Sequence, residues 1–240
     1  MAEADNPGGY RPDDPRYGLS GQALQEYYLA QPPQWFIKSM YRPGAVEKRE
    51  TAMAEHLAHA RAHLEQFHFA GPLITDDGTT PIGTMCIIEM PDRETAAAFA
   101  AGDGYAKAGT LEPPQIIRFV SSKRLKQHDR EPDPDQQLFV CECIDGPDAA
   151  ALRPTVAAEH HAYQGSIIDR YIAHGPLRSD DGKGLVGSLF LIEAPDRAAL
   201  AAAWSFVSIP PRPNAPLGPA YCSNWGSPAL ASRTNWAFGS

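Results

Sequence analysis

The sequence predicts an α+β protein made of two tandem copies of one ferredoxin-like module, with irregular extensions at both ends. Three observations support this prediction: an internal repeat, the same order of strand and helix patterns in both copies, and an ordinary globular composition. Hydrophobic residues make up 43% of the chain and charged residues 21%. The length of 240 residues has room for two modules of roughly 100 residues each.

The internal repeat is a gap-free correspondence over a long stretch, at the offset that separates His56 from His160, 160 − 56 = 104 residues. The matching segments, first copy then second, include Arg49 and Arg153, Gly71-Pro72-Leu73 and Gly175-Pro176-Leu177, Asp76-Asp77-Gly78 and Asp180-Asp181-Gly182, and Pro91-Asp92-Arg93 and Pro195-Asp196-Arg197. Chance does not easily place so many unlike residues in register, so we infer a duplication.

Each copy has the order β-α-β-β-α, which is the ferredoxin-like arrangement of helices on one face of an antiparallel sheet. Strands are expected at 35–41, 83–90 and 115–120 in the first copy, and at 138–144 and 185–194 in the second. Apolar side chains at helical spacing predict a helix over 46–67, and its counterpart is expected over 150–170. The Asp-Asp-Gly segments are typical of turns. Asp92 and Asp196 are expected to cap alanine-rich second helices.

The resulting division of the chain has five parts. They are an N-terminal extension (1–33), a first module (34–121), a linker (122–136), a second module (137–206) and a C-terminal arm (207–240) rich in Pro, Gly and Trp. The prolines of 208–216 exclude a central strand there. We expect the arm to pack irregularly through Trp225 and Trp236, and the two modules to pair their sheets as an intramolecular pseudo-dimer.

Composition excludes several classes of function. A net charge of −8 argues against nucleic acid, whose phosphates require clustered basic residues. No apolar run approaches the ~20 residues of a membrane helix, and the acidic N-terminus lacks the features of a signal peptide, so we expect a cytoplasmic protein. None of the four cysteines stands in a Cys-x-x-Cys pair, and no Gly-rich phosphate loop is present. We therefore expect no metal and no cofactor.

The motif string of the first copy is Glu55-His56, Gly71-Pro72-Leu73, Asp76-Asp77-Gly78, Asp103-Gly104-Tyr105 and Ala108-Gly109. This string resembles the YciI-like family, also called the YCII-related domain, over about 35–120 and 137–205. The resemblance implies a dimeric α+β barrel fold and a His–Asp pair as the active site, and one member of that family resembles a dehydrochlorinase. The family usually has Asp-Pro-Tyr at 103–105, and the second copy has no counterpart of this segment.

His56 is the first candidate catalytic residue, because it lies at the margin of the helix's apolar stripe and imidazole suits proton transfer at neutral pH. Asp77 or Asp103 would orient its ring, and the Tyr105 hydroxyl would stabilise negative charge on oxygen. The alternative for His56 is a structural hydrogen bond, and for the aspartates and Tyr105 polar turns. Candidate substrate-binding residues are Gly71, Pro72, Asp76, His160 and Asp181. The His56, His59 and His63 row is interpreted as facing the surface.

These residues predict a cofactor-independent enzyme of the lyase or isomerase type, acting on a small aromatic or enolisable substrate by His–Asp acid–base catalysis. Two alternatives stay open: a non-catalytic protein that binds small molecules, and a structural pseudo-dimer. The expected partner is the small-molecule substrate, with neither nucleic acid nor membrane, and a homodimer of the tandem chain stays open as well.

Overall fold

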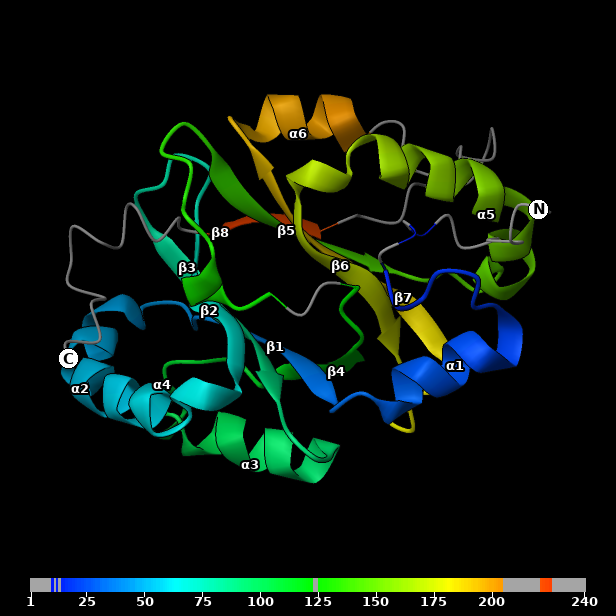
Figure 1. Ribbon diagram of the computed structural model, residues 1–240. Helices are drawn as coiled ribbons and strands as arrows, with labels where there is room; N and C mark the ends of the chain where they lie inside the picture. Colours follow the sequence, from blue (N-terminus) through cyan, green and yellow to red (C-terminus); the bar gives the residue numbers. More distant parts are fainter. Residues whose placement is uncertain (1–9, 11, 13, 123–124, 205–220, 226–240) are drawn as a thin grey trace, which may run out of the picture.

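The computed structural model describes residues 10–204 and 221–225, apart from 11, 13, 123 and 124. At its centre the described strands form a closed antiparallel barrel in the order β1-β3-β2-β8-β5-β7-β6-β4 (Figure 1). The strands are β1 (Gln34–Met40), β2 (Phe67–Ile74), β3 (Pro81–Glu89), β4 (Gln115–Phe119), β5 (Gln137–Ile144), β6 (Tyr171–Arg178), β7 (Leu185–Ala194) and β8 (Tyr221–Trp225). The helices are α1 (Gly21–Ala30), α2 (Val46–Ala62), α3 (Arg93–Gly102), α4 (Gly104–Lys107), α5 (Ala149–Ser166) and α6 (Arg197–Trp204).

Each half of the chain contributes one four-stranded sheet to the barrel. The first half has the order β4-β1-β3-β2 and the second the order β8-β5-β7-β6. The sheets join at two places, where β4 pairs with β6 and β8 pairs with β2. The last strand of each half therefore lies beside the second strand of the other, and closure leaves the barrel without a free edge.

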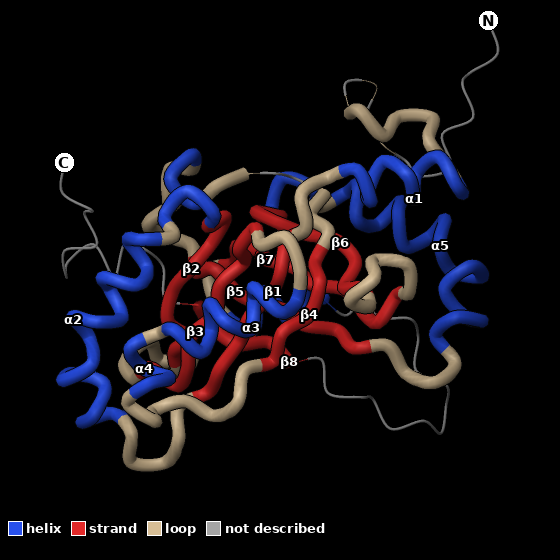
Figure 2. Tube along the Cα trace, turned by 90° about the horizontal axis from the view of Figure 1, so that it is seen from below, coloured by secondary structure: helices blue, strands red, loops and turns tan. Residues whose placement is uncertain are grey.

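The helices lie outside the barrel (Figure 2). In the first half α3 packs on β1 and β4, and α2 packs against α4; in the second half α6 packs on β7. Alternation along the strands explains this arrangement, because one face of β1 carries Phe36 toward the barrel interior and the other carries Trp35 and Ile37 toward α3. The interior core combines side chains from both halves, among them Phe36, Phe119 and Leu138.

One buried ion pair joins the two halves inside the barrel. The Lys38 ammonium of β1 contacts the Glu142 carboxylate of β5, and both side chains are largely buried. The Gln115 side chain of β4 donates to the other carboxylate oxygen of Glu142, at 2.5 Å. Lys38 and Glu142 are separated by 104 residues, so two positions that match in the internal sequence correspondence meet across the barrel.

The α+β class and the antiparallel sheet predicted from the sequence are confirmed, and strand β7 has the expected bounds. The carboxylate of Asp92 caps α3 by accepting from the Thr95 N–H at 2.7 Å. The expected helix over 46–67 ends earlier, at Ala62, because Leu64–Gln66 form a 3₁₀ turn and Phe67 already begins β2. Ser20 precedes α1, but its side chain makes no capping hydrogen bond.

The expectation of a wholly irregular C-terminal arm was wrong at Tyr221–Trp225. These residues form β8, which pairs with β2 and β5 and completes the second sheet. The sequence conceals β8 because the segment before it is rich in proline, which cannot donate to a ladder, although Tyr221–Trp225 itself contains none. The proline-rich segment 208–216 and Trp236 lie outside the described residues. No helix in the described part of the chain combines the length and apolarity needed to cross a membrane.

Candidate functional site

The main pocket of the described structure lies in the first half, between the outer face of the sheet and helices α2, α3 and α4. Its volume is about 70 Å³, several times the space of one water molecule. The walls are mostly apolar or aromatic, and the chemistry-bearing side chains among them are Tyr41, Arg49, His56, His59, Asp103 and Tyr105. A small apolar pocket with a few convergent polar groups is the usual form of a small-molecule site.

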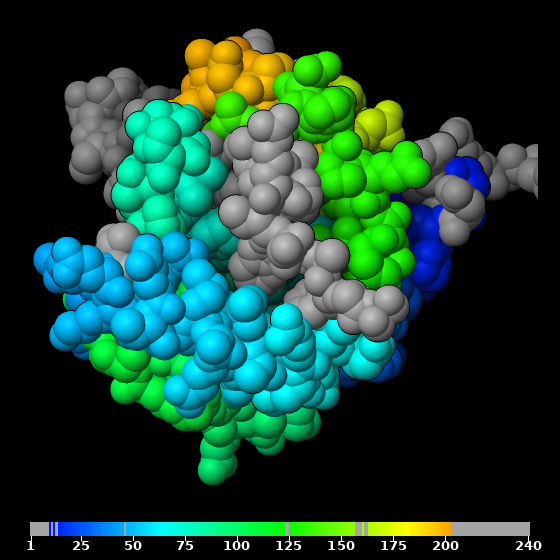
Figure 3. All heavy atoms as spheres, turned by 90° about the vertical axis from the view of Figure 1, so that its left-hand side faces the viewer, coloured from blue at the N-terminus to red at the C-terminus, as the bar shows by residue number. Residues whose placement is uncertain are grey.

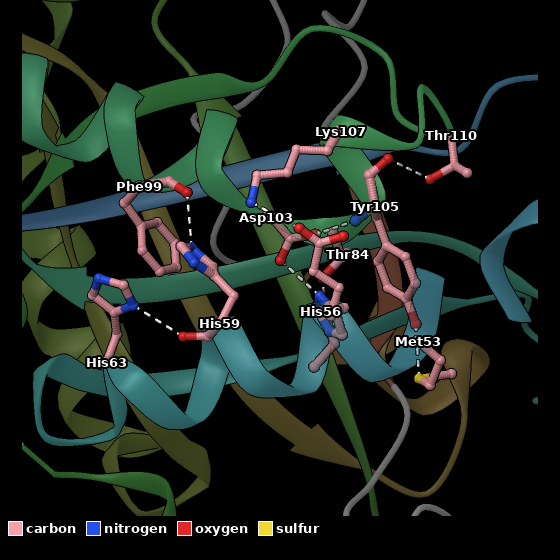
Figure 4. Close-up of polar contacts among 12 residues, drawn as sticks. Met53, His56, His59, His63, Thr84, Phe99, Asp103, Tyr105, Lys107 and Thr110 are labelled. Carbon is pink, nitrogen blue, oxygen red and sulfur yellow. Dashed lines mark hydrogen bonds and ion pairs between the residues drawn. The ribbon is translucent and has the colours of Figure 1, made fainter. Parts of the chain in front are cut away.

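A hydrogen-bonded His–Asp pair is part of the lining of this pocket (Figure 4). His56 projects from α2 and its Nδ1 donates to Oδ2 of Asp103 at 2.7 Å; each side chain is 14% exposed. A ring whose Nδ1 carries the proton has its lone pair on Nε2, and no described residue forms a hydrogen bond with Nε2. The pair therefore presents a basic nitrogen on a ring that lines the pocket.

The short helix α4 fixes Asp103 in place. The second carboxylate oxygen of Asp103, Oδ1, accepts from the Tyr105 N–H at 2.8 Å and so caps α4 while Oδ2 holds His56. Gly104 permits the close approach of α4 to α2, because a Cβ atom there would lie 2.5 Å from the backbone nitrogen of His56. The glycine at this position, a departure from the Asp-Pro-Tyr segment described above, therefore has a packing role.

Tyr105 is the third member of the cluster. Its ring is buried and stacks on the His56 ring, with centroids 4.0 Å apart and planes at 14°. Burial raises the pKa of Tyr105 to about 12, against the opposing influence of the Arg49 guanidinium. The hydroxyl donates to the Met53 sulfur at 2.9 Å. A thioether is a weak acceptor, so this hydroxyl is protonated at neutral pH and can be redirected to a better acceptor.

Arg49 and Tyr41 belong to the pocket, although we did not predict either as a site residue. The Arg49 guanidinium carbon lies 5.8 Å from the ring centroids of both Tyr41 and Tyr105. Its Nε is buried and has no hydrogen-bond partner. The repetition of Arg49 at Arg153 was the signal in the sequence that could have identified it.

His59 also lines the pocket, so the interpretation of a surface-facing histidine row was wrong for this residue. Its Nε2 donates to the Phe99 carbonyl at 2.9 Å, and its ring stacks on Phe99. Burial, and then the neighbouring His63, lower the pKa of His59, which favours the neutral ring. Cys86 lines the same pocket, but burial raises the pKa of its thiol, so it is not a reactive thiolate.

The adjacent carboxylates of the first Asp-Asp-Gly turn do not reach the pocket. Asp77 accepts from Thr75 and Thr79 within its own exposed turn, and these bonds lower the pKa of Asp77. Of the two aspartates expected to orient His56, Asp103 does so and Asp77 does not. Asp76 forms a bidentate ion pair with Arg197 of the second half, both bonds at 2.6 Å, and does not line the pocket of the first half.

The substrate-binding candidates are thus divided. Gly71 and Pro72 line the pocket from β2. Asp181 repeats the behaviour of Asp77, accepting from Ser179 and from the Lys183 N–H within an exposed turn. His160 lies on α5 and does not line the pocket of the first half. Among the described residues no three His, Cys, Asp or Glu side chains are grouped as metal ligands.

Comparison with solved structures finds similarity to a part of the chain and similarity to most of it. A dehydrochlorinase of 5-chloro-2-hydroxyhydroquinone from Burkholderia phenoliruptrix, in complex with 2,5-dihydroxybenzoquinone, is 25% identical, with a TM-score of 0.32; the match covers 35% of this chain and 89% of that one. A mutant chlorite dismutase from Candidatus Nitrospira defluvii is 10% identical, with a TM-score of 0.55. This match covers 87% of this chain and 97% of the dismutase chain. A heme-binding protein from Thermus thermophilus is 11% identical, with a TM-score of 0.51. This match covers 84% of this chain and 95% of the heme-binding protein.

The two longer matches, at 10% and 11% identity, show likeness of fold alone. They agree with the dimeric α+β barrel fold that the resemblance implied. No curated protein matches the chain. Residues 34–120, which hold the pocket and the His56–Asp103 pair, match the family model of the YCII-related domain. This part of the chain is therefore similar to the YCII-related domain family.

Proposed function

We propose that the first half is a cofactor-independent enzyme that moves a proton on a small enolisable or aromatic substrate, with His56 as the acid–base group. The observation that carries this proposal is the 2.7 Å hydrogen bond from Nδ1 of His56 to Asp103, in a small pocket with aromatic walls. Asp103 fixes the tautomer and stabilises the ring once it is protonated.

In this reaction Nε2 of His56 accepts a proton from a carbon beside a carbonyl group. The electron pair of the broken C–H bond moves to the carbonyl oxygen and forms an enolate, which the Tyr105 hydroxyl stabilises by donating a hydrogen bond. Return of the proton to another carbon completes an isomerisation. Expulsion of halide or hydroxide from the neighbouring carbon completes an elimination. Positioned acid–base catalysis of this kind supplies about 10²–10⁴-fold.

We also propose that the two halves are a duplicated module that pairs as an intramolecular pseudo-dimer. Two ion pairs between the halves support this, since Arg93 contacts Asp180 at 3.3 Å and Arg197 contacts Asp76 at 2.6 Å. Each residue of one pair is the repeat counterpart of a residue of the other. Such reciprocity is the signature of a twofold interface. Figure 3 shows the β2–β3 turn, in teal, beside α6, in orange.

The two sites are unequal in this proposal. The first half has its own Asp103 and Tyr105 beside His56, whereas the counterpart of this segment in the second half lies outside the described residues. We expect the second half mainly to support the barrel.

The test is a screen of small ketones, 1,3-dicarbonyl compounds and hydroxylated aromatics in deuterated water, followed by NMR for deuterium uptake, isomerisation or release of a leaving group. The expected result is turnover by the native protein and none by His56→Ala, which should keep the native melting temperature within a few degrees. Binding without any proton transfer in the native protein would favour a non-catalytic binding protein instead.

A further inference from the structure

We propose that Arg49 is the anion-recognition residue of this pocket, and that the substrate is a small organic carboxylate whose acidic C–H lies a few atoms from its carboxyl group. The inference deepens the proposed function, on which it rests for the role of His56. Its starting point is a cation that the rest of the described protein leaves without a carboxylate partner, next to a general base.

The environment of Arg49 supports this role. Burying a guanidinium is costly unless its N–H groups find acceptors, and yet Nε of Arg49 is buried without a partner. The carboxylates near the pocket are occupied: Asp103 holds His56 and caps α4, and Glu55 pairs with Lys107 at 2.8 Å. Within the described residues, Arg49 therefore has the phenol oxygens of Tyr41 and Tyr105 as hydrogen-bond partners, but no carboxylate pairs with it.

The second half gives an internal comparison. Arg153, the repeat counterpart of Arg49, forms a bidentate ion pair with Asp145, at 2.6 and 2.9 Å. The residue of the first half that corresponds to Asp145 is Tyr41. The same arginine is thus neutralised by a protein carboxylate in one half and faces a phenol in the other. In the first half a ligand carboxylate can take the place that Asp145 occupies in the second.

The surroundings of Arg49 define the chemistry of the ligand. A guanidinium presents N–H donors in a planar fork that matches a carboxylate. The rings of Tyr41 and Tyr105, both 5.8 Å from the guanidinium carbon, add aromatic walls, and burial raises the pKa of Tyr41, whose hydroxyl is therefore a donor as well. Tyr105 also stacks on His56. A molecule of a few carbons can therefore contact both Arg49 and His56.

The test compares acetoacetate with acetoacetamide, which have nearly the same shape and differ in charge. Their dissociation constants are measured by NMR titration on the native chain and on Arg49→Met, Arg49→Lys, Arg153→Met and His56→Ala. We expect the native protein to bind acetoacetate at least about tenfold more tightly than the amide, as for a hydrogen bond to a charged group. Arg49→Met should lose this preference, Arg49→Lys should keep part of it, and Arg153→Met should keep all of it.

The outcomes separate this inference from the proposed function. His56→Ala should keep the preference for acetoacetate, because the base is not needed for binding, while it loses proton transfer. Equal affinity for the two probes, no binding of acetoacetate, or a preference that survives in Arg49→Met would overturn the role of Arg49. Turnover of neutral substrates that depends on His56 would then leave the proposed function intact. A preference that depends on Arg49, without proton transfer on any substrate, would overturn the proposed function alone.

Discussion

Replacement of Asp103 by Asn tests the orientation of the catalytic ring. Oδ1 of Asn can still accept from the Tyr105 N–H, because Asn caps helices as well as Asp does. The amide nitrogen would then lie where Oδ2 accepts from Nδ1 of His56 at 2.7 Å. Since an amide N–H₂ only donates, Nδ1 must become the acceptor and the proton must move to Nε2. The pocket would lose its basic nitrogen.

The magnitudes follow from the contacts that change. A hydrogen bond to a charged group is worth about 1 kcal/mol more than a neutral one, and the side chains of His56 and Asp103 are each only 14% exposed, so we expect a loss of about 1 kcal/mol. For a chain of this size that lowers the melting temperature by roughly 2–4 °C. Proton transfer should fall about 10²–10⁴-fold. The loss of rate should thus greatly exceed the loss of stability.

The tautomer can be observed without knowledge of the substrate. Long-range proton–nitrogen NMR on protein with ¹⁵N-labelled histidine, at about pH 8 where a free imidazole is neutral, should show the proton on Nδ1 of His56 in the native protein and on Nε2 in Asp103→Asn. Asp77→Asn is the matched control and should leave the tautomer unchanged, since Asp77 bonds only within its turn. A native ring protonated at Nε2, or an identical spectrum in Asp103→Asn, would refute the proposed orientation.

Three further predictions concern Tyr105, Gly104 and the ion pair inside the barrel. Tyr105→Phe should lower kcat by about 10-fold or more with little change in KM, and an unchanged kcat would exclude a catalytic role of the hydroxyl. Because burial raises the pKa of Tyr105 to about 12, the native protein should show no loss of rate from ionisation of Tyr105 below about pH 11. Gly104→Ala should cost about 1–3 kcal/mol in urea unfolding, because the new Cβ meets the backbone of α2, and native stability would show that α4 can shift. Lys38→Met should cost about 3–5 kcal/mol by leaving Glu142 buried without its cation, and the double variant with Glu142→Met should recover most of this in the same assay; no recovery would contradict the pairing.

Much of the fold could be predicted because residues that match at an offset of 104 give the same local signals twice. The apolar run of β3 with Pro91 after it matches the run of β7 with Pro195 after it, at the same offset, so each prediction supported the other. Strand β8 could not be found in this way. Its segment has no recognisable counterpart in the first copy, and the prolines before it conceal a strand that is stabilised only by tertiary pairing with β2 and β5.

The site was partly predictable from the types of residue in the motif string. His56 and Asp103 were both candidates, and the structure brings them together, although 47 residues separate them in the chain. Sequence spacing could not show which of Asp103 and Asp77 contacts His56. The choice depends on whether the carboxylate accepts hydrogen bonds within its own turn, as Asp77 does, or reaches a side chain of α2, as Asp103 does. Arg49 was missed because its significance lies in a difference between the copies, Tyr41 in one and Asp145 in the other, which becomes meaningful only when the contacts are known.

The most direct measurement compares His56→Ala with His160→Ala, the same substitution at equivalent positions of the two halves. Both are assayed for proton transfer on the best substrate of the screen, with melting temperatures recorded beside the rates. Since His56 lines the pocket and His160 does not, we predict that His56→Ala abolishes activity with little loss of stability, and that His160→Ala keeps the rate within a few-fold. An inactive His160→Ala beside an active His56→Ala would place the chemistry in the other half and contradict the account.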